Sequence, residues 1–232
     1  MNATLTSRTD EIIADAEKYL IGNYGPRDLC LVRGEGTSVW DADGNEYLDF
    51  LSGLAVASLG HCHPTVTEAI QRQAATLVHV SNLYLIEPQV ELGRILAEYS
   101  PCDRSFFCNS GAEANEAAIK LARRYSFNKY GDGRADIVAL DNSFHGRTYG
   151  ALSATGQPKY HAGFGPLVPG FSFAPINDLD AVRERVTDRT CAITLEPIQG
   201  EGGVHACTQD FLPGIRQICD EKDLLLIFDE VQ

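Results

Sequence analysis

The chain has 232 residues and a globular composition, with 44% hydrophobic and 22% charged residues. Its formal net charge of -13 argues against nucleic acid and anionic membranes as partners. No apolar run approaches the roughly 20 residues that a membrane span needs. The first ten residues lack the apolar core of a signal peptide, and the seven cysteines are scattered, so we expect a protein of the reducing cytoplasm.

The first sixty residues predict a helix followed by a β-meander. A helix is expected at 8–21, because apolar residues recur on one face at positions 12, 13, 16 and 20. Three short strands are expected at 29–33, 37–40 and 47–50, separated by the glycine-containing turns at 34–36 and 43–44.

From about residue 60 the pattern changes to alternating helices and strands. Helices are predicted at 64–77, 88–99, 112–130, 178–186 and 210–221, and strands at 105–108, 137–140, 191–195 and 224–228, with a long loop at 141–175. Such alternation predicts an α/β fold with a mostly parallel sheet covered on both faces. The chain stops at the end of a predicted buried strand, which we interpret as a sign of a fragment.

Residues 106–120 predict a short strand, a tight turn at Ser110 and Gly111, and the first turns of a helix. The free N–H groups and the dipole of a helix start favour an anion, most plausibly a phosphate. Ser110 can cap the helix, and Gly111 lets an anion approach the backbone. An ordinary capped helix explains the same pattern, so both interpretations stay open at this point.

Polar groups follow three of the predicted strands and would meet at one edge of a parallel sheet. They lie at 141–147, at 196–203 and at 229–230. Asp229 follows five apolar residues, so its carboxylate would be partly desolvated and would need a cationic or hydrogen-bonding partner. A protonated ring nitrogen would serve, and a helix-cap or turn aspartate is the alternative.

The loop at 144–147 offers three further candidates. Phe144 could stack on a flat ring or fill a gap in the core. Arg147 could bind a carboxylate through two parallel hydrogen bonds, or form a surface ion pair. His145 could act as a general base, but its neighbours favour a loop residue.

Other motif matches fail. No phosphate-binding loop of the form GxxxxGK[ST] accompanies Asp229 and Glu230, which argues against an ATPase. The acidic residues at 41–45 lack the glycine and the glutamate of a calcium loop and predict a turn. The histidines at 61 and 63 have no matching ligand pair at zinc spacing, so we expect no metal site.

Ordered motifs along nearly the whole chain resemble the class III pyridoxal-phosphate-dependent aminotransferases of fold type I. The motifs are GEG at 34–36, WDADG at 40–44, LGHCHP at 59–64, SGAEANE at 110–116, FHGR at 144–147, EPIQGEGG at 196–203 and DEVQ at 229–232. Residues 1–60 would then be part of a smaller α+β domain. Residues 61–232 would be the N-terminal portion of the large cofactor-binding domain, incomplete at its C-terminus.

The resemblance implies pyridoxal 5'-phosphate as the cofactor and assigns residues to it. Its phosphate would be held by Ser110, Gly111 and Ala112. Its ring would stack on Phe144, pair through its protonated nitrogen with Asp229, pack against Val231 on the opposite face and approach Gln232 with its hydroxyl. The pairing with Asp229 keeps the ring an electron sink.

The resemblance also implies how the substrates and a second subunit are bound. Arg147 would bind the substrate α-carboxylate, and Glu196 would tune which carboxylates are accepted. The region of Asn82 and Tyr84 would lie near the interface of a homodimer, facing the partner's site.

Within the class, VSNLY at 80–84 and EPQ at 87–89 are most similar to the enzymes that act on N-acetylornithine. The implied reaction moves the terminal amino group of N-acetylornithine to 2-oxoglutarate, in arginine biosynthesis. Ornithine, succinylornithine and 4-aminobutyrate remain alternative donors.

The family's Schiff-base lysine falls downstream of Asp229, and the chain has no lysine in a matching position. Its five lysines are Lys18, Lys120, Lys129, Lys159 and Lys222. We therefore expect the chain to be an N-terminal portion that is inactive by itself. A non-catalytic binding or interaction derivative is the alternative of a different class, against which the set Ser110, Phe144, Arg147 and Asp229 argues.

Overall fold

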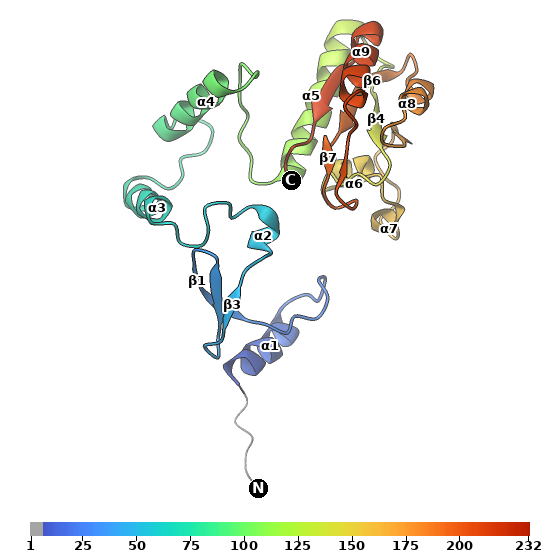
Figure 1. Ribbon diagram of the computed structural model, residues 1–232. Coiled ribbons are helices and arrows are strands. Elements are labelled where there is room, and N and C mark those ends of the chain that lie inside the picture. Colours follow the sequence, from blue (N-terminus) through green and yellow to red (C-terminus); the bar gives the residue numbers. More distant parts are fainter. Residues whose placement is uncertain (1–6) are drawn as a thin grey trace. The chain divides into compact units, whose positions relative to one another are not determined.

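The computed structural model describes residues 7–232 (Figure 1). These residues form two compact units, one ending at Leu92 and the other comprising Gly93–Gln232. The division into domains of residues 1–60 and 61–232 remains a prediction, and its first six residues lie outside the described part of the chain.

The first unit contains helix α1 (Arg8–Tyr19) and a three-stranded antiparallel sheet. Ser7 begins α1 with a capping box: its hydroxyl accepts the N–H of Asp10 at 3.1 Å, and the Asp10 carboxylate accepts the N–H of Ser7 at 3.2 Å. The sheet has the order β1 (Leu31–Glu35), β2 (Ser38–Asp41) and β3 (Glu46–Leu48). The predicted helix and β-meander are confirmed.

Asp41 shapes the turn between β2 and β3. Its carboxylate accepts the backbone N–H groups of Asp43 at 3.0 Å and Asn45 at 2.8 Å. It also accepts the side-chain amide of Asn45 and the hydroxyl of Tyr47, each at 2.8 Å. All of these donors come from within six residues of Asp41, so the acidic cluster at 41–45 folds the predicted turn.

Three helices follow the antiparallel sheet. They are α2 (Ser52–Ala55), α3 (Pro64–Thr76) and α4 (Glu87–Tyr99), of which α4 crosses the boundary between the two units. The helices predicted at 64–77 and 88–99 are confirmed to within one residue. The sequence did not predict α2, because four residues with Gly53 and Leu54 at positive φ carry no helical periodicity.

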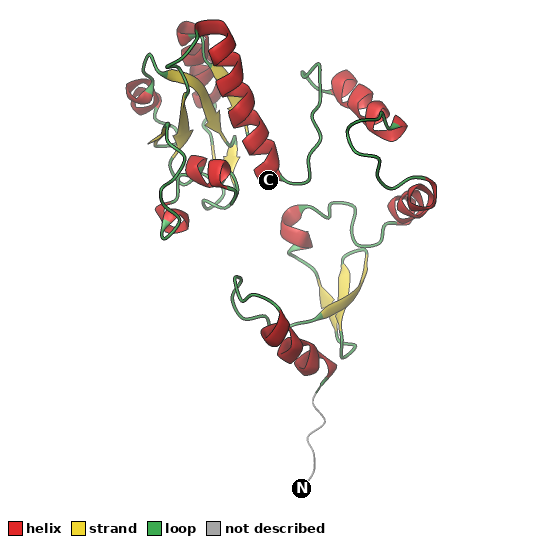
Figure 2. Ribbon diagram, turned by 180° about the vertical axis from the view of Figure 1, so that it is seen from behind, coloured by secondary structure: helices red, strands yellow, loops and turns green. Residues whose placement is uncertain are grey.

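The second unit contains a four-stranded parallel sheet. Helices lie around this sheet in Figures 1 and 2. Its order is β5 (Phe171–Ala174), β4 (Asp136–Leu140), β6 (Thr190–Leu195) and β9 (Leu225–Phe228). Successive side chains of a strand point to opposite faces of the sheet. Neighbouring residues of β4 pack in two different hydrophobic clusters, so both faces of the sheet are covered. Val138 packs with residues of α8 (Leu179–Arg185) and α9 (Phe211–Lys222), and Ile137 packs with residues of α5 (Gly111–Tyr130). The predicted α/β class is confirmed.

Two predicted segments were wrong. Residues 105–108 form no strand, and Phe106 is 72% exposed, because the apolar run has no neighbouring strand to pair with in the described chain. The predicted loop at 141–175 contains α6 (Tyr149–Ala154), α7 (Pro158–His161) and β5. Its glycines and prolines signalled turns, and β5 is only four residues long, so its pairing with β4 rather than its own sequence makes it a strand.

A two-stranded hairpin completes the second unit. It joins β7 (Ile198–Gln199) to β8 (His205–Ala206). All other predicted helices and strands occur, with ends within two residues of the prediction. No helix in the described residues is long and apolar enough to cross a membrane.

Candidate functional site

The carboxyl ends of β4, β6 and β9 lie at the same edge of the parallel sheet, and their polar residues are connected there. The N–H of Asp229, after β9, donates to the carbonyl of Leu195 at the end of β6. The N–H of Phe144, after β4, donates to the Glu196 carboxylate at 3.0 Å. The convergence expected from the sequence is therefore present in the second unit.

Asp229, which follows the outermost strand β9, is a buried carboxylate at this edge, with its side chain 5% exposed. His145 Nδ1 lies 2.7 Å from Oδ2, and Asn115 Nδ2 donates to the same oxygen at 2.8 Å. Burial pushes the pKa of Asp229 up, but the hydrogen bonds from His145 and Asn115 outweigh it, so this pKa lies below its ordinary value. The site thus keeps an ionised carboxylate in a desolvated place.

The sequence predicted that Asp229 needs partners but not which residues they are. His145 lies in a loop, as predicted, and the structure buries it there beside Asp229. Its Nε2 has no hydrogen-bond partner among the described residues. Asn115 lies one turn into α5, where its position four residues after Gly111 on the same helix face was the available signal.

The other oxygen of Asp229 keeps capacity for a ligand. Oδ1 accepts the N–H of Val231 at 3.2 Å, and no other bond to Oδ1 is found within residues 7–232. A hollow of about 340 Å³ lies beside Asp229, lined also by Gly200, Val204 and Gln232. A cationic N–H donor entering this hollow would complete the hydrogen bonding of the carboxylate.

The N-terminus of α5 lies near the same residues. Ser110 caps the helix through its hydroxyl, which accepts the N–H of Glu113 at 3.2 Å. The Glu113 carboxylate accepts the N–H of Asn109 at 2.6 Å, outside the helix. The N–H groups of Gly111 and Ala112 therefore have no acceptor within the helix, and they are available to an anion.

Glycine is required where the first turn of α5 meets the segment after β9. A Cβ added at Gly111 would lie 2.8 Å from Cγ1 of Val231 and 2.9 Å from Cγ2. A Cβ added at Gly200 would lie 2.8 Å from Cγ of Gln232. The first close approach brings Val231 to the predicted anion site at Gly111, and the second brings Gln232 to the loop after β6.

The loop after β4 supplies an aromatic group and a cation. The ring of Phe144 meets the ring of Tyr160 edge-on, with centroids 5.6 Å apart and an interplanar angle of 71°. The guanidinium carbon of Arg147 lies 6.0 Å from the Phe144 centroid and 4.8 Å from the Tyr160 centroid. Arg147 is exposed, so its charge is accessible from solvent.

Glu196 is a second buried carboxyl group, 5% exposed, at the end of β6. Burial raises its pKa, an effect that the N–H of Phe144 and the nearby His145 only partly offset. The pKa of Glu196 therefore lies above its ordinary value, whereas the pKa of Asp229 lies below its own. This divergence is typical of functional sites.

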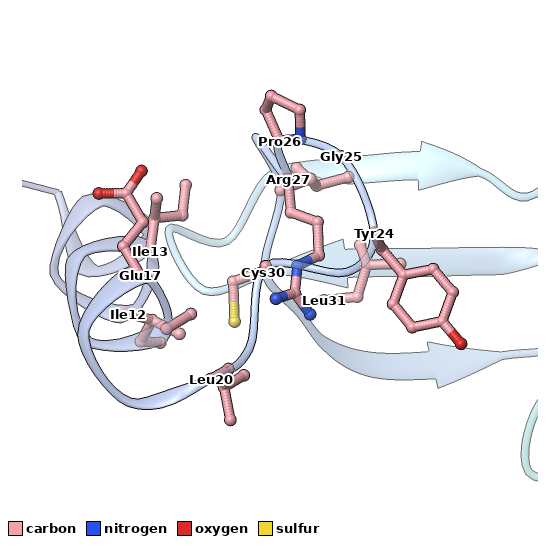
Figure 3. A pocket seen from close by; sticks show the side chains of 13 residues that line it. Ile12, Ile13, Glu17, Leu20, Tyr24, Gly25, Pro26, Arg27, Cys30 and Leu31 are labelled. Atoms are coloured by element: carbon pink, nitrogen blue, oxygen red, sulfur yellow. The ribbon is translucent and has the colours of Figure 1, made fainter. Parts of the chain in front are cut away.

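The remaining predicted residues, Asn82 and Tyr84, belong to the first unit, between α3 and α4, and Tyr84 is 70% exposed. The first unit also has an apolar groove of about 570 Å³ between α1 and the segment at 22–31, into which Ile12, Leu20 and Cys30 point (Figure 3). None of the predicted site residues lines it.

The second unit thus combines the start of a long helix, an ionised buried carboxylate with capacity for a donor, an aromatic ring and an unneutralised arginine. These residues fit a ligand that carries a phosphate and a protonated ring nitrogen, together with a substrate that carries a carboxylate. An aminotransferase-like site would have this chemistry.

Comparison with known proteins places the chain in one family. The family described as aminotransferase class-III matches residues 21–232, so the chain belongs to the class III aminotransferases. Its relatives include the acetylornithine aminotransferase of Caldanaerobacter subterraneus, 58% identical over 95% of this chain and 56% of that protein. The acetylornithine aminotransferase of Methanocaldococcus jannaschii is 52% identical over 93% of this chain and 54% of that protein.

Solved structures agree with the fold. The ornithine aminotransferase of Toxoplasma gondii superposes with a TM-score of 0.90 at 33% identity, covering 97% of this chain and 54% of that one. The N-acetylornithine aminotransferase of Stenotrophomonas maltophilia gives a TM-score of 0.77 at 34% identity, covering 93% of this chain and 52% of that one. The chain spans a little over half the length of the relatives it matches.

Proposed function

We propose that the complete protein is a pyridoxal-phosphate-dependent aminotransferase that transfers the terminal amino group of N-acetylornithine to 2-oxoglutarate, in the cytoplasm and in arginine biosynthesis. The observation that carries the proposal is Asp229, a buried carboxylate that His145 and Asn115 keep ionised at the end of β9. The names of the relatives support the choice of donor.

We assign the phosphate of the cofactor to Ser110, Gly111 and Ala112. The uncommitted N–H groups at the start of α5 and the helix dipole support this assignment. The nearby Glu113 carboxylate is turned to Asn109, which leaves these donors to the phosphate.

We assign the ring of the cofactor to Phe144, Val231, Gln232 and Asp229. Phe144 and Val231 would contact its faces, Gln232 would approach its hydroxyl, and Asp229 would accept the N–H of its protonated nitrogen through Oδ1. When bound, the cofactor supplies an electron sink that carries the amino group from donor to acceptor. The ionised Asp229 maintains the charge on that nitrogen, and this is the chain's own contribution to the chemistry.

We assign the substrates to Arg147 and Glu196. Both N-acetylornithine and 2-oxoglutarate carry an α-carboxylate, which the planar fork of Arg147 can bind through two hydrogen bonds. Glu196, whose pKa is raised by burial, would tune which carboxylates are accepted. The region of Asn82 and Tyr84 would contribute to the interface of a homodimer with shared sites.

One relative suggests a second donor. A protein of Pseudomonas aeruginosa that is 51% identical over 94% of this chain and 54% of its own length is named succinylornithine transaminase/acetylornithine aminotransferase. N-succinylornithine is therefore a second candidate donor.

The test is a substrate comparison with the complete gene product loaded with pyridoxal phosphate. We expect kcat/KM with 2-oxoglutarate to be highest for N-acetylornithine or N-succinylornithine, and lower for ornithine and 4-aminobutyrate. A preference for ornithine or 4-aminobutyrate would refute the donor assignment. Absence of transamination with all four donors by a fully loaded protein would refute the proposed function.

A further inference from the structure

Arg147 is held by aromatic rings rather than by an opposite charge. Its guanidinium carbon lies 4.8 Å from the centroid of Tyr160 and 6.0 Å from that of Phe144. Within residues 7–232 we find no hydrogen bond and no ion pair to this guanidinium. By contrast, Arg183, Arg189 and Arg216 of the same unit each pair with a carboxylate, at 2.8, 3.0 and 2.6 Å.

The difference matters for a group that must bind an anion. A carboxylate partner would occupy the N–H fork of Arg147 and would compete with an incoming carboxylate. A ring face attracts the cation through its quadrupole but takes none of the five N–H donors. An arginine resting on a ring is therefore oriented and still uncommitted.

The fold fixes Tyr160 under Arg147. Tyr160 lies in α7, and its N–H donates to the carbonyl of Gln157 at 3.0 Å. Gln157 is buried, and its side-chain amide donates to the carbonyl of Ser143 at 3.1 Å. His161, next in α7, lies 3.0 Å from the carbonyl of Leu152 in α6. These bonds tie α7 to the loop that carries Phe144 and Arg147.

We propose that Tyr160 is a positioning residue that determines the preference for substrates with an α-carboxylate, because its ring face holds Arg147 oriented without neutralising it. The inference rests on the proposed carboxylate-binding role of Arg147. Phe144 supports the arrangement by its edge-on contact with the Tyr160 ring.

The first test measures binding without turnover in the complete, cofactor-loaded protein. The probe is glutarate, a dicarboxylate that cannot accept an amino group, and calorimetry gives its Kd. Tyr160→Leu should raise the Kd of glutarate by about 3- to 30-fold, the range expected for the loss of a partly desolvated cation–π contact. Tyr160→Phe, which keeps the ring, should stay within about 2-fold of the parent.

A ring series separates attraction from packing. Tyr160 is replaced by phenylalanine (Tyr160→Phe) and then by difluorinated and tetrafluorinated phenylalanine, which keep the shape of the ring but withdraw electron density from its face. The glutarate Kd should rise stepwise with the number of fluorine atoms. A Kd that stays constant through the series would overturn the inference, even if the leucine variant fails to fold.

The kinetic test compares two donors that differ only in the carboxylate. Tyr160→Leu should raise KM for N-acetylornithine by about 3- to 30-fold with kcat little changed. N-acetylputrescine, which lacks the carboxylate, should react at the rate of the parent enzyme. An equal loss of kcat/KM for both donors would show that Tyr160 has only a structural role, and would overturn the inference.

The chain offers a matched control outside the site. The guanidinium carbon of Arg134 lies 4.2 Å from the ring centroid of Tyr130. Arg134 Nε donates to the carbonyl of Thr190 at the start of β6, at the end of the sheet opposite the candidate site. Tyr130→Leu should leave the glutarate Kd unchanged. Arg147→Ala separates the two proposals: if it leaves glutarate binding intact, the assigned role of Arg147 fails, whereas a loss there with no effect at Tyr160 refutes only the present inference.

Discussion

Replacing His145 by leucine should leave the Asp229 carboxylate buried without its nearest partner. In the structure the two side chains are 0% and 5% exposed, and Nδ1 lies 2.7 Å from Oδ2. Removing one hydrogen-bond partner of a buried carboxylate costs about 1.5–3 kcal/mol, because the remaining charge cannot return to water. The amide of Asn115 and the N–H of Val231 remain and place the expected loss near the lower end of that range.

The assay is urea unfolding of the cofactor-free complete protein, compared among variants at pH 7. Asp229→Asn should destabilise the parent, since it removes the charge that His145 and Asn115 stabilise and replaces the oxygen that accepts the N–H of Val231 by a donor NH2 group. In the His145→Leu background the same change should instead stabilise the protein by about 1–3 kcal/mol, because it removes an uncompensated charge. His161→Leu is the control, since the His161 side chain lies beside a backbone carbonyl and the ring of Phe173 but pairs with no carboxylate, and its loss should cost about 1 kcal/mol.

The pH dependence gives an independent check. The folded pKa of Asp229 is depressed, so in the parent its contribution is present above its ordinary pKa of 3.8 and is lost as pH falls through the folded value. The His145→Leu variant lacks the hydrogen bond that most strongly opposes the effect of burial on the pKa of Asp229. Protonation of Asp229 then removes a poorly compensated buried charge, so the free energy of unfolding of the variant should approach that of the parent as pH falls. Additive effects of the two substitutions, with parallel pH curves, would refute the reasoning.

Three further predictions concern packing, a second carboxylate and a thiol. Gly111→Ala should destabilise by about 1–3 kcal/mol through contact with Val231, and Val231→Ala in the same chain should relieve most of it, as measured by urea unfolding. The Glu116 carboxylate accepts the hydroxyl of Thr148 at 2.6 Å and the N–H of Gly150 at 2.7 Å. Burial raises the pKa of Glu116, but these hydrogen bonds outweigh it, so the pKa lies below its ordinary value. Glu116→Gln should therefore lose about 1–3 kcal/mol at pH 7, with the difference from the parent shrinking as pH falls below 4.5. Burial raises the pKa of Cys219 to about 11, so a thiol reagent at pH 8 should spare it in the native protein, and mass spectrometry of the labelled peptides checks this.

Each of these predictions has a control in the chain. Gly93→Ala should not destabilise, because a Cβ added at this helical position meets no other atom within 4 Å. Glu184→Gln, at an exposed position, should change stability by less than about 0.5 kcal/mol at any pH. The exposed Cys102 should be labelled before Cys219. Equal effects at test and control positions would contradict the packing, the hydrogen bonds or the burial on which the predictions rest.

Local patterns in the sequence predicted most of the fold but only part of the site. Five apolar residues before Asp229 predicted a desolvated carboxylate in need of a partner, and the structure provides two. Those partners lie 84 and 114 residues away along the chain. Their identity depends on how α5 and the loop after β4 pack on the sheet, which no local pattern records.

The segment around Tyr160 could not be predicted for a different reason. Its glycines and prolines indicate turns, and α7 has only four residues, too few to show a helical period. Buried bonds from Gln157 and His161 hold it in place instead. The residue that rests under Arg147 was therefore invisible in the sequence, although Arg147 itself was a predicted candidate.

The way each charged group is held separates the groups that maintain the structure from those available for chemistry. Arg189 pairs with Asp136, and Arg216 pairs with Asp220, so their charges are already neutralised. Arg147 rests on ring faces, and Glu196 accepts a backbone N–H, so neither is cancelled by an ion pair of its own. Because a carboxylate can displace water from such an arginine without first breaking an ion pair, Arg147 is the cation of this edge best suited to bind substrate.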